Sequence, residues 1–139
     1  MLRMKGSPEG DPFVLAMEAR LARVTGIGGL FFRAKDPAAL LAWYARWFGM
    51  PDGGMPWTQE AGMTVFAPFA TATDYFPADR QWMLNLRVEG LNEMVAAFQA
   101  EGIAVETRPD WDGDGSYGHF ARVHDPEGNP IELWEPPVT

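Results

Sequence analysis

A pattern that occurs twice in the chain limits its fold more than any other feature. When residues 29–36 are aligned with residues 83–90, Arg33 falls on Arg87, and the apolar positions of the following segments also coincide. Glycine then ends both segments, at Gly49 and Gly102. Because the hydrophobic period, the helix start and the final glycine agree in register, the sequence indicates two tandem copies of one structural unit.

Each copy has the pattern of one strand, one helix and three further strands. Asp36 suits the N-cap of the first helix and Pro37 its first position, and apolar spacing continues to Phe48. The second helix is predicted at residues 91–101. The predicted strands are 25–34, 55–60, 62–68 and 72–77 in the first copy, and 82–88, 103–108, 117–124 and 130–135 in the second. Proline and glycine within residues 125–129 predict a tight hairpin between the last two strands.

These elements predict an α+β domain at residues 24–137, made of two βαβββ modules at about 24–80 and 81–137. Residues 1–23 lie outside the repeat and are rich in glycine and proline at their beginning. They are expected to form a flexible tail with a possible short helix from residue 13.

Charge and composition exclude several classes of function. The net charge of -8 disfavours binding to nucleic acid, because the phosphate backbone repels an acidic surface. No apolar run is long enough to span a bilayer, and the first 24 residues lack the continuous apolar stretch of a signal peptide. Cysteine is absent, which excludes disulfides, thiolate metal sites and a thiol nucleophile. A cytoplasmic protein without nucleic-acid or membrane partners is therefore expected.

The segment Asp125-Pro126-Glu127-Gly128-Asn129-Pro130-Ile131-Glu132-Leu133, together with two βαβββ modules, resembles the vicinal oxygen chelate superfamily. This superfamily includes glyoxalase I, ring-cleaving dioxygenases, and fosfomycin and bleomycin resistance proteins. The resemblance covers roughly residues 24–137. It implies a curved mixed sheet around a cleft that holds a small organic molecule, and a homodimer of such chains.

The resemblance also implies where a divalent metal would be bound, and here the sequence departs from the family pattern. The three ligand positions, usually His or Gln, His and Glu, fall on Gly29, Met83 and Glu132. Glycine has no side chain, and a thioether is a poor ligand for the cations of this family. His119 and His124 point to opposite faces of one strand and are interpreted as surface residues. No cofactor is therefore expected, and a divalent metal is disfavoured.

An acidic run near residue 112 resembles the beginning of a calcium-binding loop, but the sequence does not complete such a loop. Asp110, Asp112 and Asp114 alternate as at the start of a calcium-binding loop, but the position of the required closing acid is Ala121. A solvated hairpin loop is expected instead.

Strand alternation assigns a cleft-facing set of side chains. Arg122 and Glu132 then lie on adjacent strands, and an ion pair between them is predicted in place of the metal. Such a pair either fills an inherited hole, or anchors an acidic ligand through Arg122, or tunes Glu132 as a catalytic base. The aromatic residues Trp57, Tyr75, Trp82 and Tyr117 are candidates for the rim. The predicted ligand-binding residues are Phe31, Arg33, Met83, Asn85, Arg87, Phe120, Arg122, Glu132 and Trp134.

Three functions fit these features. The first is a metal-free module that binds a small organic molecule, as bleomycin resistance proteins do. The second is a lyase, isomerase or dioxygenase of the same superfamily that uses Glu132 with a non-standard metal site or none. The third is a protein-interaction module with a remnant cleft, for which residues 1–23 are the only support.

Overall fold

The structure is a computed structural model that describes residues 11, 12 and 22–138. The chain divides into two units, residues 1–32 and residues 33–139, which are described separately. The predicted tail and its short helix fall almost wholly outside the described residues. In the first unit, residues 22–32 contain neither helix nor strand.

The helix of the first predicted module forms where the sequence places it. Helix α2 spans Pro37–Phe48, and the Asp36 side chain accepts a hydrogen bond of 3.1 Å from the backbone N–H of Ala39. Gly49 ends the helix in the left-handed conformation, with φ of 71°, which favours a residue without Cβ. The N-cap, the proline position and the glycine stop are thus confirmed.

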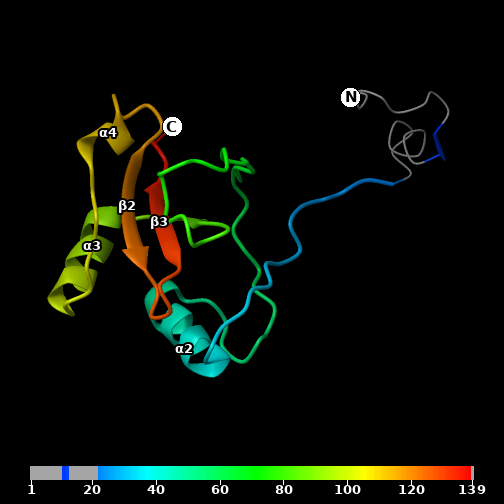
Figure 1. Cartoon of the computed structure of the whole chain (residues 1–139), viewed down its shortest axis with the longest axis horizontal. Coiled ribbons are helices and arrows are strands. Elements are labelled where there is room, and N and C mark those ends of the chain that lie inside the picture. Colours follow the sequence, from blue (N-terminus) through cyan, green and yellow to red (C-terminus); the bar gives the residue numbers. More distant parts are fainter. Residues whose placement is uncertain (1–10, 13–21, 139) are drawn as a thin grey trace. The chain divides into compact units, whose positions relative to one another are not determined.

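The elements of the second predicted module form one small mixed sheet with helices (Figure 1). The strand order is β1-β3-β2, with β1 parallel and β2 antiparallel to the central strand β3. The strand predicted at residues 103–108 does not form: only an isolated bridge from Glu106 to Arg122 lies there, at the outer side of β2. The elements are β1 (Leu84–Arg87), α3 (Leu91–Ala100), α4 (Pro109–Asp112), β2 (His119–His124) and β3 (Pro130–Glu135).

The first predicted module differs from this pattern. Residues 25–34, 55–60, 62–68 and 72–77 contain no strand, although alternation predicted four strands there. A strand is stabilised by hydrogen bonds to a neighbouring strand, whereas alternation indicates only which side chains would share a face. The three-stranded mixed sheet is therefore established, while the tandem modules and the curved sheet around a cleft stay predictions.

The hydrophobic core lies between one face of the sheet and the two longer helices. Ala121, Val123, Ile131 and Leu133 point from β2 and β3 toward this core and are fully buried. Phe98 of α3 is also fully buried, and its ring stacks on Trp47 of α2 at a centroid distance of 4.3 Å. Because this face is filled by apolar side chains, polar chemistry is confined to the opposite face.

The hairpin between β2 and β3 connects the second module to α2. Asp125 is buried, and its carboxylate accepts hydrogen bonds from the Tyr44 hydroxyl at 2.7 Å and from the backbone N–H groups of Glu127 and Asn129. Burial, followed by the hydrogen bond to Asp125, raises the pKa of Tyr44 far above its usual range, so this phenol stays protonated and donates. The Glu127 carboxylate in turn accepts the backbone N–H of Asp36 at 3.0 Å. The predicted tight hairpin is confirmed.

The acidic segment begins differently from the expected hairpin loop. Pro109–Asp112 forms the single helical turn α4, because proline suits its first position and Gly113 follows it in a positive-φ conformation. Within the described part of the chain, no helix is long and apolar enough to cross a bilayer.

Candidate functional site

The face of the sheet opposite the core carries two rows of aligned side chains. In the first row Asn85 of β1 pairs with Glu132 of β3, which pairs with Arg122 of β2. Side chains at paired positions of adjacent strands lie on the same face. The second row consists of Arg87, Trp134 and Phe120 in the same strand order, and the Trp134 and Phe120 rings are stacked at 6.4 Å.

Glu132 lies at the centre of the polar row and is only 7% exposed. One carboxylate oxygen accepts a hydrogen bond of 2.5 Å from the Tyr75 hydroxyl, and the other accepts one of 2.7 Å from Nδ2 of Asn85. Burial, followed by the hydrogen bond to Glu132, raises the pKa of Tyr75 above its usual range, against a smaller lowering effect of Arg122. Tyr75 therefore stays protonated at neutral pH and acts as the donor.

Arg122 is buried beside Glu132, with 6% of its surface exposed. Its guanidinium carbon lies 4.9 Å from the centroid of the Tyr75 ring and 4.8 Å from that of the Trp111 ring. Rings at this distance attract a cation through their faces. The two ring centroids are 6.1 Å apart, so the rings lie on neighbouring sides of the guanidinium rather than on opposite ones.

The predicted ion pair between Arg122 and Glu132 is wrong, although both residues are buried and paired in register. Tyr75 and Asn85 occupy the carboxylate oxygens of Glu132. In the part of the chain that the structure describes, Nε and Nη2 of Arg122 are buried without a hydrogen-bond partner. A buried donor left unpaired costs about 1–3 kcal/mol, and more when it is charged. Arg122 is therefore expected to bind more favourably to any acceptor that reaches these two donors.

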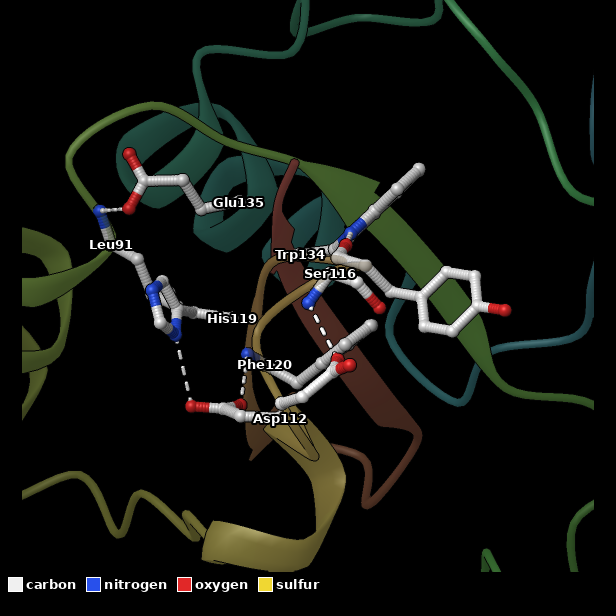
Figure 2. A network of polar contacts seen from close by, with 9 residues as sticks. Leu91, Asp112, Ser116, His119, Phe120, Trp134 and Glu135 are labelled. Carbon is white, nitrogen blue, oxygen red and sulfur yellow. Dashed lines mark hydrogen bonds and ion pairs between the residues drawn. The ribbon is translucent and has the colours of Figure 1, made fainter. Parts of the chain in front are cut away.

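Helix α4 is fixed to β2 by the side chain of Asp112, which contacts His119 and Phe120 (Figure 2). The Oδ1 atom of Asp112 accepts the backbone N–H of Phe120 at 3.0 Å, and Oδ2 lies 3.0 Å from Nδ1 of His119. Trp111 directly precedes Asp112, so these contacts hold its ring near Arg122. Figure 2 also shows the Glu135 carboxylate accepting the backbone N–H of Leu91 at the start of α3.

A surface groove of about 530 Å³ borders Arg122. Apolar side chains from residues 72–78 line one part of it, and Glu106 and His124 line another. A smaller cavity of about 340 Å³ lies at the start of α2 beside Glu127. The Glu127 carboxylate in that cavity already accepts the backbone N–H groups of Lys35 and Asp36. It is therefore already paired, unlike the two buried nitrogens of Arg122. The groove beside Arg122 is the better ligand site.

The predicted site residues are only partly brought together. Asn85, Arg87, Phe120, Arg122, Glu132 and Trp134 share the polar face. Arg87 donates from Nη2 to the backbone carbonyl of Glu60, and Met83 directly precedes β1. Arg33 is exposed before α2, and Phe31 belongs to the first unit, so neither is placed with this face.

Two contributors to the site were underestimated or missed in the sequence. Tyr75 was a rim candidate, but it binds both Glu132 and Arg122. Trp111 was missed because it stands within an acidic run that resembled a solvated loop. An aromatic residue between two acids was the only available signal. The interpretation of the histidines as surface residues is confirmed, since His119 and His124 are both exposed.

The residues at the family's metal positions do not fit a divalent ion. Gly29 offers no donor, Met83 offers a thioether, and both oxygens of Glu132 are engaged by protein donors. Among the described residues, no group of three or more His, Asp or Glu side chains converges on one point. A metal bound here would have to displace Tyr75 or Asn85 from the carboxylate.

Two comparisons with known proteins bear on this site. The family model described as a glyoxalase-like domain matches residues 29–134, which include α2, α3, β1, β2 and all but the last residue of β3. A search of curated proteins found no match.

Proposed function

Since the chain belongs to the glyoxalase-like domain family, we propose that it binds a small organic molecule on the polar face of the sheet without the divalent metal common in its superfamily. The observation that carries the proposal is the state of Glu132. Its carboxylate is buried and held by two neutral donors, Tyr75 and Asn85. Stacked aromatic rings and an adjacent groove provide the apolar surroundings typical of a small-molecule site.

Metal analysis tests this proposal directly. Protein purified without chelators is expected to contain far less than one equivalent of Mn, Fe, Ni or Zn by elemental analysis, because only one of three ligand positions has a suitable side chain. The Glu132→Gln variant is expected to contain the same amount. About one equivalent of a single metal, lost in Glu132→Gln but retained in Glu127→Gln, would refute the metal-free site.

A second candidate is an enzyme of the lyase, isomerase or dioxygenase type with Glu132 as general base. Burial of this carboxylate beside Tyr75 favours it, because catalytic bases are commonly found in such surroundings. Solvent deuterium incorporation into a panel of 2-oxo acids distinguishes the candidates. A lyase or isomerase that uses Glu132 to remove a proton from carbon would catalyse the exchange and lose it in Glu132→Gln, whereas a binding module would not catalyse it.

We also propose that the functional form is a homodimer. Residues 55–69 are exposed throughout and form no strand, although they carry many large apolar side chains. Exposed apolar surface of this extent commonly marks an interface. The most exposed members are Met55, Met63, Val65 and Phe66.

The mass in solution tests the dimer. Light scattering after size exclusion is expected to give about twice the chain mass of 15.4 kDa. A double variant, Val65→Asp with Phe66→Asp, is expected to give the monomer mass, because buried unpaired charges oppose association. Ala42→Asp, at an exposed position of α2, is the matched control and should stay dimeric. An unmodified chain that stays monomeric at roughly 100 µM would contradict the proposal, because a specific dimer should form well below this concentration.

A further inference from the structure

The buried guanidinium of Arg122 lies beside two aromatic rings but, in the described part of the chain, lacks acceptors for part of its N–H groups. The centroids of the Tyr75 and Trp111 rings lie 4.9 and 4.8 Å from its central carbon. Aromatic rings attract the cation, but they do not replace hydrogen-bond acceptors in the guanidinium plane, where its N–H groups point. Nε and Nη2 have no hydrogen-bond partner among the described residues. These two nitrogens form the side of the guanidinium that commonly binds a carboxylate through two parallel hydrogen bonds.

The acids nearest to Arg122 in the sheet are already engaged elsewhere. Glu132, its partner on β3, is bonded to Tyr75 and Asn85. Glu106, its partner on the other side, accepts bonds from both Nε and Nη2 of Arg108 through one oxygen. Carboxylates therefore lie near Arg122, but none of them binds Nε and Nη2, the pair of nitrogens called its fork below.

We propose that the ligand is a small carboxylic acid whose carboxylate binds Nε and Nη2 of Arg122. This inference rests on the proposed function and names the chemical class of its ligand. The apolar body of the acid lies in the groove against Phe76 and Pro77, which border it together with Arg122. A neighbouring side chain moves aside on binding, because both nitrogens are covered in the structure.

A carboxylate fits this place better than a phosphate. Asp74 and Glu106 also line the groove, and Glu132 lies beside Arg122. Two negative charges on the ligand would be repelled by these acids more strongly than one. The planar fork of two N–H groups also matches the two oxygens of a carboxylate.

Calorimetric titration of the full chain with three matched probes tests the charge of the ligand. Benzoate carries a carboxylate, benzamide is its neutral counterpart, and benzamidinium is its cationic counterpart. Benzoate is expected to bind saturably, and the other two at least about tenfold more weakly, because only benzoate offers acceptors to a buried guanidinium. Benzamide or benzamidinium binding as tightly as benzoate would overturn the carboxylate, as would the absence of saturable benzoate binding.

Two variants locate the contact. Arg122→Gln is expected to weaken benzoate binding at least about tenfold, because it removes both donors and the charge. Arg46→Gln is the matched control: Arg46 is exposed on α2, pairs with Glu101 and does not line the groove, so this variant should bind benzoate within about twofold of the unmodified chain. Unchanged binding in Arg122→Gln would exclude Arg122 as the anchor.

A measurement on the unmodified chain keeps the test valid if Arg122→Gln fails to fold. In nitrogen-15 NMR spectra, the Nε–H resonance of Arg122, assigned by its absence in Arg122→Lys, is expected to move on addition of benzoate but not of benzamide. A resonance that does not respond to benzoate overturns the inference. Equal binding of a neutral or cationic probe would also overturn the inference. It would leave the proposed function intact, because that function is refuted only by about one equivalent of bound metal.

Discussion

Replacing Phe98 with Ala is expected to lower the free energy of unfolding by about 3–5 kcal/mol. The Phe98 side chain is fully buried in α3, and its ring stacks on Trp47 of α2 at 4.3 Å. Phe48 packs against the same ring at 6.0 Å. Removal of the ring therefore leaves a cavity between both helices and the sheet, in addition to the lost transfer of apolar surface from water. Urea unfolding followed by circular dichroism measures the change.

A substitution by Ala at an exposed position provides the control. Val138 is fully exposed and lies outside the proposed dimer interface, so Val138→Ala is expected to change the free energy of unfolding by less than about 0.5 kcal/mol. If both variants lost similar stability, the placement of α2 and α3 on one hydrophobic core would be incorrect. A loss of unfolding free energy well below about 3 kcal/mol in Phe98→Ala would also show that this placement is incorrect.

Replacing Asp125 with Ala is expected to cost roughly 2–4 kcal/mol of unfolding free energy, because it leaves several buried donors without an acceptor. The Asp125 carboxylate accepts four hydrogen bonds, from the Tyr44 hydroxyl, the backbone N–H groups of Glu127 and Asn129, and Nδ2 of Asn129. It thereby shapes the hairpin before Glu132 and connects this hairpin to α2. Thermal unfolding at neutral pH measures the loss.

A second variant shows whether the bond to α2 contributes. Tyr44→Phe removes only the hydroxyl, so its cost is expected to be smaller, about 1 kcal/mol, and to be non-additive with that of Asp125→Ala. Asp79→Ala, at an exposed position, serves as the surface control. Additive effects of Tyr44→Phe and Asp125→Ala would show that the two side chains do not interact.

The local signals in the sequence predicted several elements at their correct positions. Asp36, Pro37 and Gly49 bound α2 as expected, because capping and the left-handed stop depend on neighbouring residues. The hairpin from Asp125 to Asn129 and the strand at residues 130–135 also agree with the prediction. Alternation correctly put Asn85, Arg122 and Glu132 on one face, because side-chain direction in a paired strand has a fixed period.

Strand formation in the first module was beyond the reach of the sequence pattern. Residues 25–34 were predicted as a strand just as residues 82–88 were, yet only the second segment contains one. β1 forms because β3 lies beside it and supplies hydrogen bonds. The availability of a partner strand depends on distant residues and is absent from a local pattern.

The contacts within the site were equally non-local. The sequence predicted that Arg122 and Glu132 would be neighbours, and they are, but it also predicted that they would bond. Tyr75 and Asn85 instead bind the oxygens of Glu132, and the rings of Tyr75 and Trp111 lie beside the guanidinium. Tyr75 is far from both Glu132 and Arg122 in the sequence, so only the packing of the chain brings the three residues together.

The sequence by itself determined the family, the helix boundaries, the final hairpin and the loss of two metal ligands, since these depend on residue identity and short-range spacing. Only the tertiary structure decided which strands find partners and how each polar group is satisfied. The free fork of Arg122 belongs to this second class. Whether a buried donor is paired depends on the directions of all side chains around it, and these are fixed when the chain packs.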